Sequence, residues 1–267
     1  MPVLIRRPEP PLAGLVEAII YRSGGQPQAS VEKILPSAET GLWVNLNRDA
    51  FRSFDDSGRA SQVPGAMLAG PTSRACVIEF EQGHAHVSVA FALGGASCFF
   101  GVPLEVARDE LVPLEVLWGR SGLRDRLLEA RTPADALDVM EGVLLRRLAG
   151  AVAPDPGMVA AAEGLSRGVR VGEVSRELGL LPRTLRRRFT AQVGLTPKRF
   201  AMVQRMRRVV RDLDGQRQVD WAAVAARHGY ADQPHLADEF RVLAGVTPNE
   251  YLRSRIDGPT HLRVPDP

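Results

Sequence analysis

Two segments in the second half of the sequence repeat one pattern, and this repeat constrains the fold more than any other feature. Val171–Gly179 and Trp221–Gly229 are similar runs that both end in glycine. A leucine, a phenylalanine, a glycine and a Thr-Pro pair then follow in both segments, and the offsets from leucine onward are four, five and two residues in each. Matched offsets of this kind indicate two copies of one small structural unit.

The repeated unit has the pattern of a helix-turn-helix. Gly179 is placed to end a first helix in the left-handed conformation that favours glycine. Pro182 is placed at the first position of a second helix, on which Leu185 and Phe189 are spaced i,i+4 and face inward. A second helix set across the first by a short turn can enter the major groove of DNA.

The formal net charge of +3 conceals an uneven distribution. Residues 1–150 carry a net charge of −3, whereas residues 151–267 carry +6. Residues 181–211 contain ten basic residues and no acidic one. Like charges at helical spacing repel, so a run of one sign needs a compensating partner, and DNA phosphate is the natural one. The alternative is a basic face that only keeps a small domain in solution.

Motifs in both units carry a family resemblance. They are Leu185–Phe189 and Gly194–Pro197 in the first unit, and Gly229–Leu236, Phe240 and Gly245–Tyr251 in the second. On these motifs, residues 157–253 resemble the DNA-binding domain of AraC-type (AraC/XylS family) transcriptional regulators. The resemblance implies seven helices, with two helix-turn-helix units joined by a long helix at about 198–213. It also implies double-stranded DNA as a partner and, for many members, contact with RNA polymerase.

The resemblance places the two recognition helices at about 182–192 and 233–242. Arg183, Arg186 and Arg187 are the candidates for base edges, because the arginine fork matches O6 and N7 of guanine together. Each such pair discriminates by ~1–3 kcal/mol. The residues expected to contact DNA are Arg183, Thr184, Arg186, Arg187, Arg188, Lys198, Arg199, Gln233, His235 and Asp238.

The sequence departs from the family pattern at two places. Leu181 stands where the family usually has a serine N-cap, which weakens the start of the first recognition helix by about 1 kcal/mol. Asp238-Glu239 stands where the family often has Arg or Lys, and carboxylates near phosphate are repulsive. We therefore expect the first unit to supply most of the affinity, and the second to supply alignment or modest specificity.

The first half of the chain is predicted to be a β domain. Segments 15–21, 41–46, 74–80 and 86–93 are rich in Val, Ile, Phe and Trp, and their spacing predicts an antiparallel sandwich or barrel. The order of motifs over about residues 10–120 resembles a cupin-like sensor domain of some AraC-type regulators. The expected fold class is therefore α+β, with this antiparallel β domain followed by an all-α domain.

A helix and a linker connect the two halves. Thr132-Pro133 followed by apolar residues at helical spacing predicts an amphipathic helix over 133–149, whose apolar face packs on the sheet or on a second subunit. Monomer and homodimer both remain open. The expected division is a sensor domain at 1–120, a helical connector at 121–150, a linker at 151–157 and the DNA-binding domain at 158–267.

The leading hypothesis is a one-component, sequence-specific regulator whose N-terminal domain responds to a small-molecule effector of unknown identity. His84 and His86 form the H-x-H with which enzymatic cupins begin a metal site, but the other histidines all lie in the basic half. We interpret them as a hairpin-end pair, and expect no metal, no cofactor and no enzymatic activity. The alternatives are a metal-dependent cupin enzyme with a DNA-binding appendage, and a ligand-blind architectural protein that binds DNA.

The cellular context follows from two further observations. Apolar runs stay far below the ~18 residues that a membrane span needs, and no apolar segment follows the first charged residues. The two cysteines cannot form a disulfide framework. We expect a cytoplasmic protein without a membrane partner.

Overall fold

Two antiparallel sheets form the first half of the molecule in the computed structural model, which describes residues 3–24, 30–55, 57–80, 83–216, 218–256 and 260–264. The strands of sheet A, in spatial order, are β1 (Val3–Arg6), β2 (Val16–Arg22), β9 (His86–Phe91), β4 (Gly41–Asn45), β7 (Ala66–Ala69) and β10 (Leu111–Pro113). The strands of sheet B are β11 (His261–Arg263), β3 (Ser30–Ile34), β8 (Cys76–Phe80), β5 (Ala50–Phe54) and β6 (Ala60–Pro64). The four strands predicted from the sequence are confirmed as β2, β4, β8 and β9.

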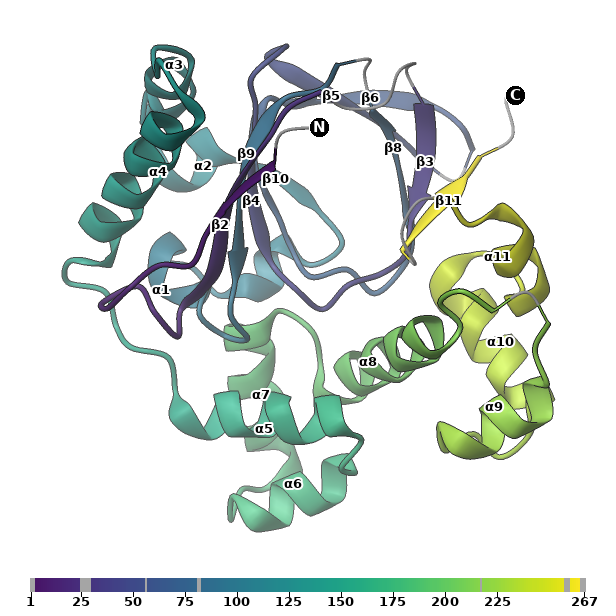
Figure 1. Cartoon of the computed structure of the whole chain (residues 1–267). Helices are drawn as coiled ribbons and strands as arrows, with labels where there is room; N and C mark the ends of the chain where they lie inside the picture. Colours follow the sequence, from purple (N-terminus) through teal and green to yellow (C-terminus); the bar gives the residue numbers. More distant parts are fainter. Residues whose placement is uncertain are drawn as a thin grey trace.

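Short helices and one long helix cover sheet A (Figure 1). They are α1 (Ser97–Phe100), the 3-10 helix η1 (Leu104–Ala107), α2 (Leu114–Trp118), α3 (Leu123–Leu128) and α4 (Pro133–Leu148). Thr132 caps α4 by accepting from the Asp135 backbone N–H at 3.1 Å, in a capping box. Leu137, Met140 and Leu144 are buried in one core with Val87 of β9. The apolar face of α4 therefore packs on the sheet.

Seven helices follow in the described second half, and they lie below the sheets in Figure 1. They are α5 (Pro156–Arg167), α6 (Val171–Glu177), α7 (Pro182–Val193), α8 (Pro197–Asp212), α9 (Trp221–Arg227), α10 (Gln233–Ala244) and α11 (Pro248–Ser254). Gly179 and Gly229 have φ of 62° and 74°, the left-handed conformation that turns α6 into α7 and α9 towards α10. The two predicted helix-turn-helix units and the joining helix α8 are thus confirmed.

The core of the helical half extends into the β domain. Phe189, Phe200, Phe240 and Tyr251 are fully buried in it, as the repeated pattern predicts. Leu35, which follows β3, is buried in the same core. Burial of a phenylalanine side chain contributes roughly 1.5–3 kcal/mol, so these repeated aromatic residues stabilise both units.

The chain returns to the first domain through a strand that was not predicted from the sequence. β11 pairs antiparallel with β3, in the register His261↔Ile34, and Figure 1 shows it along the edge of sheet B. The Leu262 side chain is 1% exposed, and His261 Nδ1 lies 2.7 Å from Glu32 Oε2. The unpaired N–H and C=O groups of an edge strand favour such an addition. The described part of the second domain is therefore helical apart from this one strand.

None of the helices in the described ranges combines the length and the apolar character that crossing a membrane requires.

Candidate nucleic-acid interface

The exposed side of α7 carries three guanidinium groups. Leu185 and Phe189 are buried against the rest of the first unit, so the helical period turns Arg183, Arg186 and Arg187 outward, where all three are exposed. None of these three has an ion pair or a side-chain hydrogen bond with any residue that the structure describes. This face is free to meet an anionic partner.

The N-terminus of α7 has no side-chain cap. Leu181 occupies the N-cap position with φ −64° and ψ 145°, and it contributes no capping hydrogen bond, as expected from the sequence. Its side chain is 60% exposed, so it contributes little by burial. The backbone N–H groups at this end of the helix therefore lack the protein oxygen that a serine would provide.

A serine at this position should stabilise the protein. Leu181→Ser is expected to raise the free energy of unfolding by about 1 kcal/mol, because the hydroxyl oxygen can accept from the first N–H groups of α7. Urea unfolding of the full chain measures the change. Leu181→Val removes similar apolar surface without offering an oxygen, and it is the matched control. Equal stability of the two variants would contradict this account of the cap.

Half of the ten basic residues in 181–211 have partners within the protein. Their partners lie in distant segments, and the pairs are Arg188–Asp155, Arg199–Ser73 C=O, Arg205–Glu239, Arg207–Glu39 and Arg208–Ser166 C=O. Three of these arginines each pair with a carboxylate of the protein. An anionic partner therefore has less positive charge to neutralise in residues 181–211 than the sequence indicates. Lys198 and Arg211 are exposed, together with Arg183, Arg186 and Arg187 of α7.

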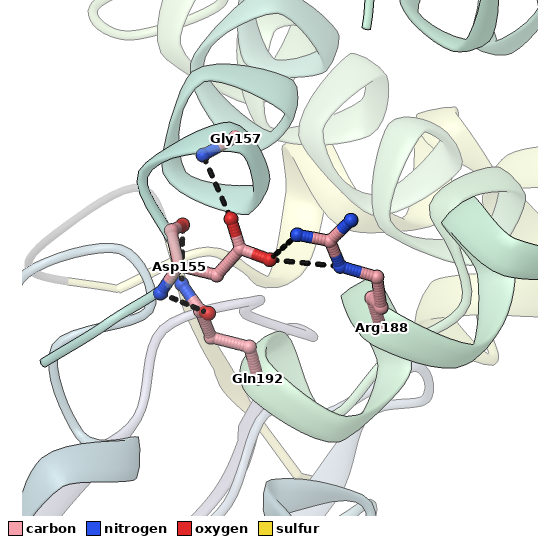
Figure 2. Close-up of polar contacts among 4 residues, drawn as sticks. All are labelled: Asp155, Gly157, Arg188 and Gln192. Carbon is pink, nitrogen blue, oxygen red and sulfur yellow. Dashed lines mark hydrogen bonds and ion pairs between the residues drawn. The ribbon is translucent and has the colours of Figure 1, made fainter. Parts of the chain in front are cut away.

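Asp155 connects the linker to the recognition helix α7 through hydrogen bonds and an ion pair (Figure 2). Its carboxylate accepts from the Gly157 N–H at 3.0 Å, which caps α5, and from Nε of Arg188 at 2.9 Å. Gln192 accepts from the Asp155 backbone N–H at 2.8 Å and donates to its carbonyl at 3.3 Å. Arg188, expected to contact DNA, is thus turned towards the linker, and it helps to set the position of α7.

Asp155→Ala should destabilise the chain by about 1–2 kcal/mol. The cap contributes ~1 kcal/mol, and a partly exposed ion pair adds ~0–1 kcal/mol. Thermal unfolding of the full chain measures the loss. Asp155→Asn keeps the cap and removes the charge, so its cost should stay below 1 kcal/mol, or about half that of the alanine variant. An asparagine variant as unstable as the alanine variant would show that the ion pair outweighs the cap.

The second recognition helix presents fewer charges. Asp232 caps α10 by accepting from the His235 backbone N–H at 2.8 Å, as predicted. Gln233, His235 and Asp238 are exposed. The imidazole Nδ1 of His235 accepts from the Ala231 N–H at 3.2 Å, which orients the ring at the start of the helix.

The expectation that Asp238 and Glu239 both present a carboxylate to DNA is wrong for Glu239. It is only 7% exposed, and both of its oxygens accept from Arg205 of α8, with Nε to Oε1 at 3.0 Å. Arg205 also donates to the Gly229 carbonyl and lies over the Tyr230 ring at 4.2 Å. The pair therefore joins α8 to the second unit, and Asp238 alone places a carboxylate on the surface of this stretch.

A basic cleft lies between the two units, with α8 on one side. Its volume is about 520 Å³, and residues of α5, α6, α8, α10 and the segment 168–170 line it. The charged and titratable side chains that line it are Arg170, Lys198, Arg205, Arg208, His235 and Glu239. Four cations against one carboxylate make the cleft attractive to phosphate.

The first domain holds both helix-turn-helix units. Gly194, at the end of α7, has φ 86°, and a Cβ atom there would clash with the Pro71 ring, so the close approach requires glycine. Arg199 donates to the Ser73 carbonyl at 2.7 Å. In the second unit, the Leu243 carbonyl accepts from the Ala75 N–H at 2.9 Å. One loop of the first domain thus contacts both units.

Two protein families match parts of the chain. Residues 174–254 match a helix-turn-helix domain, and residues 5–113 match a domain of unknown function, DUF6597. Among curated proteins, none is similar enough to count as a match.

Solved structures show weak similarity over most of the chain. ToxT from Vibrio cholerae is 11% identical, with a TM-score of 0.48 over 88% of this chain and 98% of that chain. Wild-type ToxT from V. cholerae strain SCE256 with bound unsaturated fatty acid is 10% identical, with a TM-score of 0.45 over 88% and 94%. The AraC-like transcriptional activator CuxR is 14% identical, with a TM-score of 0.31 over 79% and 86%.

The assignment rests on the family match and on the geometry of the second half. The match covers both repeated units, and these units fold as two helix-turn-helices joined by α8. The motifs that resemble AraC-type regulators lie at the turns and buried positions of these units. Residues 174–254 therefore belong to this helix-turn-helix family, and the chain is a DNA-binding transcriptional regulator.

Proposed function

We propose that this chain is a one-component regulator that binds a specific operator through α7 and α10. The observation that carries the proposal is the exposed arginine face of α7, formed by Arg183, Arg186 and Arg187. An arginine at a base edge reads guanine, and arginines beside the groove contact phosphate. Thr184 and Lys198 lie beside this face and complete the first contact region.

The two units contribute unequally in this proposal. The first unit supplies most of the affinity, because its recognition helix has three exposed arginines without an ion pair among the described residues and no exposed acidic residue. The second unit supplies alignment through Gln233, His235 and Asp238. The basic cleft between them lies where the phosphate backbone passes from one major groove to the next.

The first domain acts as the sensor in this proposal. A small-molecule effector bound there changes how the two units are held, through the contacts at Pro71, Ser73 and Ala75. The proposed division into domains places the linker before α5, which begins at Pro156, inside the segment 151–157 expected as linker. RNA polymerase is the further partner in this proposal. The regulator can act as a monomer or as a homodimer, and no step requires catalysis.

The test is binding of the full chain to a labelled duplex from the region upstream of its own gene. Affinity should fall steeply as salt rises, because log K falls with log salt by about 0.9 for each phosphate neutralised. A random duplex of the same length is the control and should bind at least 100-fold more weakly. Binding that is absent, or that does not change with salt, would overturn the proposal.

Footprinting gives a second readout. Two recognition helices on one face of the duplex should protect two segments that are ~10–10.5 base pairs apart. Protection of a single segment would indicate that the second unit takes no part in binding.

A further inference from the structure

Several buried side chains between the two sheets belong to neither hydrophobic core. Val87, Val89 and Phe91 of β9 face the helices that cover sheet A, so the alternation of the strand turns His86 and Ser88 towards sheet B. Phe51, Met67 and Ile78 are buried, but they belong to neither of the two cores that the described residues form. The interior between the sheets therefore combines apolar and polar side chains.

Two histidines lie there without polar partners. His84 and His86 are each 5% exposed, and their ring centroids are 5.0 Å apart. Both ring nitrogens of His84 and the Nδ1 atom of His86 lack a hydrogen-bond partner among the described residues. A buried polar group that loses water without gaining a hydrogen bond costs ~1–3 kcal/mol. The structure thus corrects the interpretation as a hairpin-end pair, since β8 and β9, which flank the turn before these residues, lie in different sheets.

Aromatic rings surround the two imidazoles. The Trp43 ring lies 4.7 Å from that of His86, at an angle of 34°. Phe51 and Phe80 present edge contacts to His84, at 5.8 Å and 6.1 Å. Such surfaces favour a flat, apolar ring, since aromatic pairs are attractive at centroid distances of ~4.5–7 Å.

The charge of the site selects the kind of polar group. Burial lowers the pKa of His84, and burial together with the charges of His84 and Arg22 lowers the pKa of His86 to about 3. Both rings are therefore neutral at physiological pH, and each offers one N–H donor and one acceptor nitrogen. A hydroxyl group can donate to one ring and accept from the other, whereas a carboxylate would lose its hydration in this buried site.

We propose that His84 and His86, with Trp43, Phe51 and Phe80, form a binding site for a small neutral aromatic molecule that carries a hydroxyl group, of the phenol class. This site gives the sensor domain of the proposed function a class of effector. Only the regulatory consequence of binding rests on that proposed function. A metal ion is disfavoured, since no three His, Cys, Asp or Glu side chains gather as a metal site in the described residues.

The site adjoins the strand that returns from the second unit. The Phe80 ring, which contacts His84, also lies 5.9 Å from the His261 ring of β11. His261 in turn pairs with Glu32 of β3. A ligand that moves Phe80 therefore acts on β11, which follows α11 directly in the chain.

The test is calorimetric titration of the full chain with phenol and catechol, beside benzoate and Zn²⁺ as comparison probes. We expect saturable binding of phenol or catechol, weakened at least tenfold in His84→Phe and His86→Phe, and no binding of benzoate. Each phenylalanine variant should keep or raise Tm, because it removes unpartnered buried nitrogens and preserves the ring. His228→Gln, which alters a histidine paired with Asp212 outside the site, is the control and should bind as the parent does.

Three outcomes would overturn the inference. They are no binding of either phenol or catechol, equal binding by the parent and both phenylalanine variants, and Zn²⁺ binding lost in those variants without phenol binding. Operator affinity is measured separately on the ligand-free protein. Phenol binding without operator binding would refute the regulatory function and leave the site standing, whereas the reverse result would refute the site alone.

Discussion

Replacing Arg186 and Arg187 together by alanine is expected to weaken operator binding by a factor of about 30 or more. Both side chains are exposed on α7, and neither has a partner among the described residues. Each bidentate arginine–guanine contact contributes ~1–3 kcal/mol, so losing two costs ~2–6 kcal/mol. If either arginine contacts phosphate instead, the slope of log K against log salt falls by about 0.9 for that residue. Fluorescence anisotropy at several salt concentrations separates the two cases.

The control for this prediction is Arg146→Ala. Arg146 is an exposed arginine on α4, which covers sheet A away from α7. Its replacement changes the net charge by one without touching the proposed interface. The double variant should retain the Tm of the parent, because exposed side chains contribute little to folding. A double variant that binds the operator as tightly as the parent would show that α7 is not the recognition helix.

Arg205→Met should reduce the free energy of unfolding by ~3–5 kcal/mol, the largest effect on stability that we expect. Removing one partner of a buried ion pair leaves the other charge uncompensated, and the carboxylate of Glu239 would then be buried without its guanidinium. The variant also loses the cation–π contact with Tyr230. Urea unfolding followed by circular dichroism measures the loss.

The matched variants are Glu239→Leu and the double variant that combines it with Arg205→Met. An apolar pair of similar volume often replaces a buried ion pair at little cost, so the double variant should recover most of the stability. The difference between the single and double variants gives the coupling energy directly. Additive losses would show that Arg205 acts through packing and not through its charge.

Local patterns predict the elements of this fold. The capping residues Thr132 and Asp232, the glycine turns at Gly179 and Gly229, and the alternation along β9 all lie within a few residues of the structure that they specify. Such interactions depend on the backbone of neighbouring residues, so sequence spacing is sufficient to predict them.

Contacts between distant segments could not be predicted in the same way. Nothing in the spacing of Asp155 and Arg188 indicates their ion pair, and β11 is too short to be recognised by its composition. Glu239 is an exception, because its place between Leu236 and Leu243 at helical spacing already indicates an inward side chain. The alternation of β9 places His86 and Val87 on opposite faces of sheet A. The face that carries His86 is buried only because the second sheet covers it.

The position of β11 has a consequence for how the chain folds. His261 and Glu32, which pair across β11 and β3, are 229 residues apart in sequence. The edge of β3 therefore stays open during synthesis until the helical half has emerged and folded. Contacts of such high sequence separation form late and slow folding, because a long loop must close before they stabilise the chain. Completion of sheet B therefore requires that both DNA-binding units have already been synthesised.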